Sequence, residues 1–544
     1  MFLQNKTTTA LILSVVALVL LPIVALAGLG LQSSGDVWAQ LWATVLPHYI
    51  VQTFLLLLGV GICSLVIAVP LAWLLTAFRF PGSQILQWLA LLPLAMPTYI
   101  IAYLAVDQLN YAGALQTGLR RLMNWQKPTD YHFPEIRSLG GAIVVMSLVL
   151  FPYIFISARA AFLKQSASQI EVSRTLGQTA WGTFFKIVLP QARPALVIGL
   201  SFVLLETLND IGAMNFFGVQ TFTLAIYSTW LGQGNLAGAA QLSLLLLLCV
   251  AFILWIEQYA RGQNNQLRQT NKTRSLEPTQ LYGWPARCAT LVASLPTLFG
   301  FIIPCAVLVR LGLRHLDVVA SPRFLINAWH SLILAVFTVV FTLLIGMLFA
   351  YAKRRGASHF IRTLILMATT GYAIPGIILG LGFLVIFGRF DNWVSPLLSA
   401  FTGIKFGLII SGSTSALVIA YVVRFLAMGH GSVDQGLQKI PTRLDDVART
   451  LGRSPSGVIA TIHLPLLRPA LLSGAIMVFV DCMKELPATL LLRPFDYDTL
   501  ASSVFTLASL DKLEESAAPA LAIVLVGLVP IYILARNLAR SDER

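Results

Sequence analysis

Long apolar runs separated by short polar stretches dominate the chain. A helix needs about 20 apolar residues to cross a bilayer, and twelve runs are that long. They lie at residues 9–31, 49–76, 84–107, 139–163, 194–215, 239–259, 287–311, 326–352, 363–388, 406–428, 467–492 and 517–536. The pattern predicts an all-α polytopic membrane protein of about twelve transmembrane helices, arranged as two parallel six-helix repeats. Ala25-Leu26-Ala27 resembles a signal-peptide cleavage site, but the first run is long and has a counterpart in the second half, so we expect a permanent span.

One polar segment between spans occurs twice. Residues 171–196 align without a gap with residues 446–471 at an offset of 275 (452 − 177), and 13 of the 26 aligned positions are identical. Chance at ordinary composition gives roughly two identities. The chain therefore consists of two copies of one unit.

Both copies have the same internal pattern. An acidic residue opens each one, a glycine suits a turn after a short helix, and a Leu-Pro pair is expected to stop a second amphipathic helix before the next span. These residues are Glu171, Gly177, Leu189 and Pro190 in the first copy and Asp446, Gly452, Leu464 and Pro465 in the second. The pattern predicts a helix-turn-helix on the membrane surface. The alternative is an ordinary interspan loop inherited from gene duplication.

The distribution of basic residues predicts the orientation. Most of those between spans gather on the side of both repeated segments and the N-terminus, which we therefore expect to be cytoplasmic; they are Arg261, Arg268, Lys272, Arg274, Lys353, Arg354, Arg355, Arg362, Arg536, Arg540 and Arg544. The loop 108–138 is an exception on the outer side; it carries Arg120, Arg121, Lys127 and Arg137 against Asp130 and Glu135. This topology and anionic lipid account for the net charge of +14 without nucleic acid.

The repeat also predicts the domain organisation. We expect a first transmembrane repeat at residues 1–259, a second at 287–544, and between them a polar cytosolic linker at 260–286 that fuses two once-separate subunits. With 57% hydrophobic and 11% charged residues, the composition is far from that of a soluble domain.

The sequence carries no pattern for a catalytic centre. The spacing of Gly177 and Gly182, and of Gly452 and Gly457, fits a phosphate-binding loop, but the Lys and Ser/Thr that such a loop requires are missing. This chain is therefore not expected to hydrolyse ATP. The cysteines lie along apolar runs without Cys-x-x-Cys spacing and are expected to be buried thiols; they are Cys63, Cys249, Cys288, Cys305 and Cys482.

Two spans carry acidic residues at equivalent positions. Glu206 aligns with Asp481 and Asp210 with Glu485, and each pair is spaced four residues apart, which predicts one helix face. A charge near the bilayer centre costs roughly 2.5–3.5 kcal/mol on insertion scales. The four acids are therefore expected to line a substrate pathway, where they would bind a cation transiently, or to form ion pairs that hold the halves together; Lys484 is the basic residue near them in sequence.

The repeated segments resemble the EAA loop of ABC importer permeases, although Glu171-Val172-Ser173 and Asp446-Val447-Ala448 replace Glu-Ala-Ala. The resemblance spans both halves and implies the type I permease fold of the bacterial inner membrane, with both termini cytoplasmic. It implies that two cytosolic ATPases, which bind ATP and Mg²⁺, dock on the loops; that a periplasmic or lipid-anchored protein delivers substrate; and that this chain binds no cofactor.

Further stretches resemble permeases for ferric iron. They are residues 481–501, Leu92-Pro93-Leu94-Ala95-Met96-Pro97 and Tyr372-Ala373-Ile374-Pro375-Gly376. Paired carboxylates fit Fe³⁺, a hard cation that prefers oxygen ligands. Pro97 and Pro375 either kink buried helices or take part in gating.

Several functions remain open from the sequence. Fused permeases for thiamine or phosphonate share the predicted architecture. A secondary transporter driven by an ion gradient can also consist of two six-span halves, but it has no use for the repeated loop. A passive scaffold or insertase leaves the membrane acids unexplained.

Overall fold

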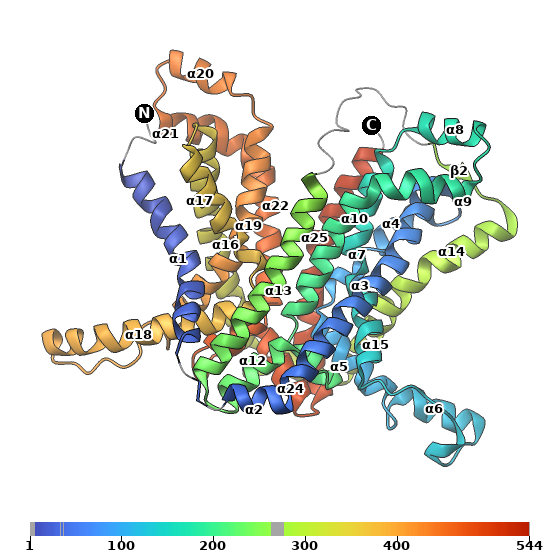
Figure 1. Cartoon of the computed structure of the whole chain (residues 1–544), viewed down its shortest axis with the longest axis horizontal. Helices are drawn as coiled ribbons and strands as arrows, with labels where there is room; N and C mark the ends of the chain where they lie inside the picture. Colours follow the sequence, from blue (N-terminus) through green and yellow to red (C-terminus); the bar gives the residue numbers. More distant parts are fainter. Residues whose placement is uncertain (1–5, 33, 36, 263–276, 543–544) are drawn as a thin grey trace. The chain divides into compact units, whose positions relative to one another are not determined.

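The computed structural model describes residues 6–32, 34–35, 37–262 and 277–542 (Figure 1). Helices make up most of these residues, and two short strands, β1 (Phe78–Arg79) and β2 (Thr279–Gln280), pair in parallel. The all-α prediction is confirmed. Most of the predicted linker, at 263–276, lies outside the described residues.

The predicted spans correspond to helices of the described chain. By length and composition, eleven helices there can cross a membrane, or twelve if the bent pair Ser83–Ala95 and Thr98–Met123 counts as one span. This agrees with the twelve predicted spans. Residues 139–163, for example, form the single helix α7 (Leu139–Leu163), which begins where Ser138 accepts a hydrogen bond from the Gly141 amide.

The helices form two compact units. Unit 2 comprises Gly35–Ser228, Leu245–His315 and Ala508–Arg544. Its helices are α2 (Val37–Thr44), α3 (Leu46–Ala77), α4 (Ser83–Leu89), η1 (Leu92–Ala95), α5 (Thr98–Leu109), α6 (Ala114–Met123), η2 (Pro128–Asp130), α7, α8 (Ala167–Thr175), α9 (Ala180–Thr183), η3 (Phe184–Val188), α10 (Leu189–Asn209), α11 (Gly212–Phe217), most of α12 (Phe222–Leu231), the later part of α13 (Leu236–Gly262), α14 (Gly283–Thr297), η5 (Leu298–Ile302), α15 (Ile303–Arg314) and α25 (Leu513–Asp542).

Unit 1 comprises Met1–Ser34, Thr229–Leu244 and Leu316–Leu507. Its helices are α1 (Lys6–Gly30), the start of α13, η6 (Leu316–Ala320), α16 (Pro322–Arg354), α17 (His359–Thr369), η7 (Thr370–Ala373), α18 (Gly376–Thr402), α19 (Thr414–Gln438), α20 (Arg443–Thr450), α21 (Pro455–Val458), η8 (Ile459–His463), α22 (Leu464–Met483), α23 (Pro487–Leu492) and most of α24 (Leu500–Ser509).

Neither unit coincides with a sequence repeat. The first helix of the chain, α1, packs on α17 and α18 in unit 1, whereas the first helices of the second repeat, α14 and α15, pack in unit 2. The last helix, α25, packs on α15 and η1 in unit 2. Each unit therefore contains chain from both repeats.

A three-helix core recurs in the two units. In unit 2, α3, α7 and α10 pack on one another; in unit 1, their equivalents α16, α19 and α22 do so. Small residues allow close approach: a Cβ added at Gly199 on α10 would lie 2.7 Å from the Cα of Ile154 on α7. Gly474, at the equivalent position of α22, would meet the Cβ of Ser432 at 2.9 Å.

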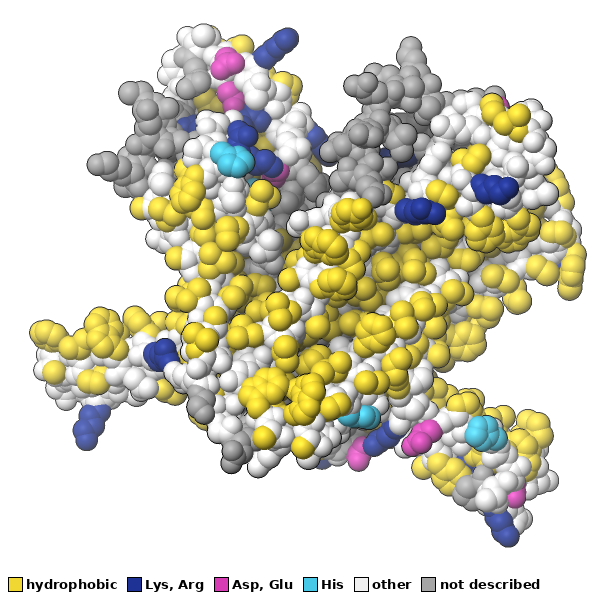
Figure 2. Space-filling model, viewed as in Figure 1, with side chains coloured by type: hydrophobic (Ala, Val, Ile, Leu, Met, Phe, Trp, Pro, Cys, Tyr) yellow, Lys and Arg dark blue, Asp and Glu magenta, His cyan; other side chains and the backbone are white. Residues whose placement is uncertain are grey.

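Large apolar side chains on the outer faces of these helices are exposed (Figure 2). On α3, Phe54, Leu58 and Val66 are exposed, and on α16, Val340 and Leu344 are exposed. Such a surface is unfavourable in water, whereas the hydrocarbon core of a bilayer solvates it. The faces therefore fit the predicted membrane environment.

The predicted stop at each Leu-Pro pair is wrong. The helix continues from α9 through η3 into α10, and from α21 through η8 into α22. Proline lacks an amide, and its ring clashes with the carbonyl four residues back. A widened π-type turn before each pair avoids this clash, since the amides of Leu189 and Leu464 reach back five residues to the carbonyls of Phe184 and Ile459.

The third span of each repeat is broken rather than kinked. Pro97 precedes α5 and Pro375 precedes α18, and both prolines adopt an extended ψ of 138°. The short helices η1 and η7 come immediately before them. The axis bends by 90° at the first break. This geometry exceeds a simple kink, while a role of the prolines in gating stays a prediction.

Candidate functional site

The first repeated segment forms two helices joined by a glycine turn in unit 2. α8 ends at Thr175, and Gly177 follows with a φ of 81°, in the left-handed region that favours glycine. Thr179 then accepts a hydrogen bond from the Gly182 amide, which starts α9. Glu171 lies exposed on α8. The predicted turn at Gly177 is confirmed.

The second repeated segment has the same geometry in unit 1. α20 ends at Thr450, Gly452 has a φ of 76°, and the Gly457 amide donates to Ser454 Oγ at the start of α21. Asp446 lies exposed on α20. Charged side chains gather at this end of unit 1, with apolar side chains along the helices beyond them (Figure 2). The two segments are equivalent in fold as well as in sequence.

Both segments expose the same apolar pair. Val172 is 55% exposed and Leu176 is 77% exposed; their equivalents Val447 and Leu451 are also 55% and 77% exposed. Residues spaced by four lie on one side of a helix. Each segment thus presents a small apolar surface at a position where the helix-turn-helix extends beyond the spans, as a docking surface requires.

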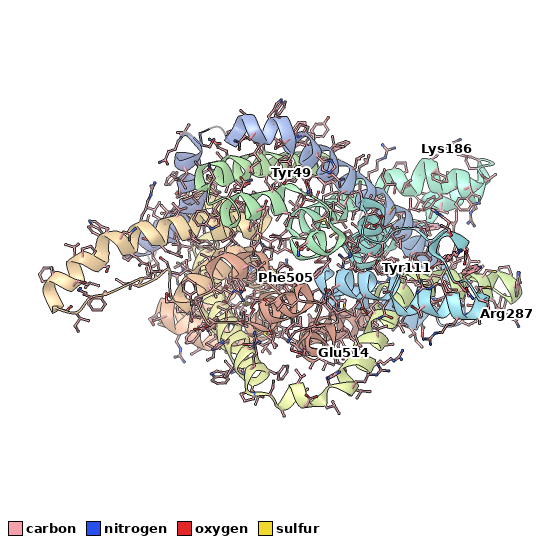
Figure 3. The ribbon with its side chains drawn as sticks, turned by 90° about the horizontal axis from the view of Figure 1, so that it is seen from below. Tyr49, Tyr111, Lys186, Arg287, Phe505 and Glu514 are labelled. Carbon is pink, nitrogen blue, oxygen red and sulfur yellow. The ribbon has the colours of Figure 1, made fainter. Side chains whose placement is uncertain are left out.

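Hydrogen bonds between polar side chains and to one backbone carbonyl hold the segment in unit 2. Ser173 and Thr183 hydroxyls lie 2.9 Å apart and connect α8 to α9, and Gln165 Nε2 donates to the Val188 carbonyl at 2.8 Å. Lys186, which is labelled in Figure 3, donates to Gln178 Oε1 at 3.2 Å. These contacts fix the turn relative to α10.

An ionic cluster holds the segment in unit 1. Arg354 donates from Nε and Nη2 to the two carboxylate oxygens of Asp445 at 2.9 and 3.0 Å, and His463 Nε2 lies 2.7 Å from the same group. Buried Ile170 and Val188 occupy the positions of Asp445 and His463 in the other repeat. Burial raises the pKa of Asp445, but the hydrogen bonds and charges of Arg354 and His463 outweigh it and hold the pKa below its usual value.

The predicted common helix face for the membrane acids is wrong. α10 ends at Asn209, one residue before Asp210, and α22 ends at Met483, two residues before Glu485. At each break, the second acid accepts a hydrogen bond from an amide in the first turn of the next short helix. Asp210 Oδ1 accepts from the Ala213 amide at 2.8 Å, and Glu485 Oε1 accepts from the equivalent Ala488 amide at 3.0 Å.

Glu485 has a buried counter-ion that the sequence spacing did not reveal. Arg424 Nε on α19 lies 3.2 Å from Glu485 Oε2, and both side chains are at least 93% buried. Gly376, the first residue of α18, packs directly on this pair, because an added Cβ would lie 2.6 Å from Glu485 Oε1. The ion pair therefore joins the break of one span to the break of another within unit 1.

The first acid of each pair has a different setting. Asp481 Oδ1 lies 2.7 Å from Lys484 Nζ, and the two side chains are 19% and 29% exposed. Glu206 is partly buried on α10. Thus Glu206 and Asp481 keep contact with the surface, whereas Asp210 and Glu485 are buried with relative exposures of 8% and 5%.

The described residues contain no cluster of three or more His, Cys, Asp or Glu side chains that could hold a metal ion. The cysteines there are free thiols as predicted, but only Cys482 is buried, and Cys288 on α14 is exposed. Most of the predicted burial is therefore wrong, since Cys63, Cys249 and Cys305 are only half-buried.

The fold and the repeated segments define a polytopic membrane protein with an internal repeat. Residues 64–262 and 342–541 match the family described as the binding-protein-dependent transport system inner membrane component. The chain belongs to this family, and it contains the family's domain twice. It is therefore a multi-span permease component of an ABC importer, without an ATPase of its own.

Individual relatives match over different lengths. The chain is 25% identical to the Fe(3+)-transport system permease protein FbpB 2 of Haemophilus influenzae, over 89% of this chain and 88% of the relative. It is 24% identical to the ferric transport system permease protein FbpB of Actinobacillus pleuropneumoniae, over 89% of this chain and 70% of the relative. The sulfate transport system permease protein CysT of Escherichia coli is 28% identical over 38% of this chain and 71% of its own length.

Proposed function

We propose that this chain is the permease of an ATP-driven importer for ferric iron. The observation that carries the proposal is that the relatives reported above that match across both fused halves are named as ferric permeases. The sulfate permease is a shorter chain and matches over 38% of this one. The resemblance of residues 481–501 to ferric permeases supports the same substrate.

Two cytosolic ATPase subunits dock on the repeated segments in this proposal. The supporting features are the shared turn geometry and the exposed pairs Val172–Leu176 and Val447–Leu451. ATP and Mg²⁺ bind to these partners, and this chain carries no cofactor. Closure of the ATPases alternates the access of the substrate pathway between the two sides of the membrane.

A periplasmic or lipid-anchored protein delivers iron on the opposite side, and both termini are cytoplasmic. In unit 2, α6 and α8 lie at opposite ends of the spans (Figure 1), which supports this topology. Single cysteines at Gln178 and Arg453 in a cysteine-free background should resist an impermeant thiol reagent outside intact cells. A cysteine at Thr129 should be labelled, and the reverse pattern would invert the orientation.

We place the substrate pathway at the acidic residues Glu206, Asp210, Asp481 and Glu485, and we assign them two roles. Glu206 and Asp481 contact the cation, since both remain partly accessible. Asp210 and Glu485 position the pathway through their caps on α11 and α23. Binding is weak and transient, because a conduit that holds Fe³⁺ tightly does not release it.

The decisive experiment is reconstitution with the ATPase and the binding protein in liposomes. We expect ATP-dependent uptake of ferric iron from the loaded binding protein and no uptake without ATP. Uptake of thiamine, a phosphonate or sulfate in place of iron would refute the substrate but leave the importer class standing. Uptake driven by an ion gradient without ATP would refute the class and favour a secondary transporter.

A further inference from the structure

The basic loop 108–138 folds into a small structure at the end of unit 2 opposite α8 and α9 (Figure 1). Its positive charge is unusual for the outer side of a membrane protein, and none of its residues is among those assigned above to docking or to the substrate pathway. Arg120 explains part of that charge structurally, because it stacks over the Tyr111 ring at 4.1 Å and donates to the Tyr111 carbonyl at 2.7 Å. It also donates to the Tyr131 hydroxyl at 3.0 Å.

The loop is held by its own contacts. The Tyr131 hydroxyl donates to Gln116 Oε1 at 2.6 Å, and the Tyr131 ring stacks on Trp125 with centroids 4.8 Å apart. Gln116 Nε2 in turn donates to the Leu109 carbonyl at 2.8 Å, which ties α6 to the end of α5. α6 therefore presents a defined surface.

That surface is amphipathic. Leu115, Leu122 and Met123 on α6 are 47%, 76% and 54% exposed, and the spacing of Leu115 and Leu122 by seven residues places them on one side. The other basic residues of the loop, Arg121, Lys127 and Arg137, are exposed around the helix. Exposed leucines beside cations, with tyrosine and tryptophan close by, fit the boundary between lipid chains and phosphate headgroups.

Unit 1 carries a similar element at the same place in its repeat. The distal part of α18 and the segment after it expose Trp393, Phe401 and Leu408, together with Lys405. The offset of 278 that relates Pro97 to Pro375 also relates Lys127 to Lys405. Two elements with unlike sequences thus place exposed apolar side chains and a lysine at the end of the third span of each repeat or just after it.

We propose that α6 and the loop to Arg137 lie on the outer leaflet of the chain's own membrane. Leu115 and Leu122 insert among the acyl chains, while Arg121, Lys127 and Arg137 contact the phosphates of anionic lipid headgroups. The position of the loop favours lipid over a protein partner. The loop follows α5 directly and leads into α7 at Leu139, so both of its ends are held beside the bilayer that surrounds these helices. The inference depends on the proposed orientation only for the choice of leaflet.

The test uses the full chain in nanodiscs with single spin labels at Leu122 and Thr129 in a cysteine-free background. Both sites are exposed, so the labels do not disturb packing. We expect the Leu122 label to be reached by oxygen dissolved in lipid and shielded from a water-soluble nickel reagent, with the opposite result at Thr129. Equal accessibility of both labels to the aqueous reagent would overturn the proposal.

A second experiment varies the lipid composition of the nanodiscs. The immersion of the Leu122 label should increase when phosphatidylglycerol replaces part of the phosphatidylcholine, and R121Q/K127Q/R137Q should abolish that increase. A Leu122 label that is shielded only after a ferric-binding protein is added would show that the surface binds protein and would refute the lipid assignment. Neither result bears on iron uptake, so this inference and the proposed function fail separately.

Discussion

Replacing both turn glycines, Gly177 and Gly452, with valine should separate ATP hydrolysis from transport. The φ angles of 81° and 76° lie in the left-handed region, where a residue with a Cβ costs about 1–2 kcal/mol. An added Cβ meets nothing within 4 Å at either position, so the cost lies in the backbone rather than in a clash. Since about 1.4 kcal/mol corresponds to a factor of ten, the equilibrium constant for forming each turn falls roughly 5–30-fold.

The two turns belong to different units, so their effects are expected to add. A pair of ATPase subunits that engages both segments at once should then bind the double variant up to roughly 30–1000-fold more weakly. The assay measures ATPase affinity by titration, together with iron transported per ATP hydrolysed in liposomes. Asparagine tolerates the left-handed region, so G177N/G452N is the matched control and should stay close to the wild type. A valine double variant that binds and transports normally would refute the docking assignment.

Three further results are expected. Truncating the exposed leucines in L176A/L451A should weaken ATPase binding by about 1.5–3 kcal/mol per buried side chain, while L122A, at a leucine of similar exposure, should not; equal effects would contradict the docking surface. Asp445 has a lowered pKa in the fold, so the stability it contributes is present above its unfolded pKa near 4 and is lost as the pH falls through the folded pKa. D445N should therefore lower the free energy of unfolding at neutral pH by about 1.5–3 kcal/mol and make that free energy less dependent on acid. An unchanged melting profile would argue against the cluster. E206Q/D481N should abolish iron uptake in a protein that still inserts and binds its ATPase, whereas poor assembly would favour structural ion pairs and normal uptake would exclude the pathway.

Local features of this chain were predictable from its sequence. Apolar run length identified the spans, and the duplicated segment identified the turns at Gly177 and Gly452, because both depend on neighbouring residues only. The same reasoning failed at Leu189-Pro190 and Leu464-Pro465, where a widened turn lets the helix continue. The presence of a proline alone does not determine whether a helix ends there or continues through a widened turn.

Contacts between side chains that lie far apart in the sequence were not predictable. Arg424 and Glu485 meet because α19 packs on α22, and nothing in their spacing marks them as a pair. The split between Asp210 and Glu485 as caps and Glu206 and Asp481 as accessible acids likewise depends on where α10 and α22 end. One signal was available: Leu486-Pro487 follows Glu485, and proline is favoured at the first position of a new helix.

The exchange of helices between the repeats has a consequence for biogenesis. During synthesis α1 emerges well before its packing partners α17 and α18, which are made more than 300 residues later. Unit 2 in turn lacks α25 until the end of the second repeat has been inserted. Neither unit can reach its final packing while the ribosome is still translating the first repeat. The early helices must therefore remain in the bilayer without their final packing partners until the later helices are inserted. The fusion of both repeats in one chain keeps these partners at a high effective concentration during that interval.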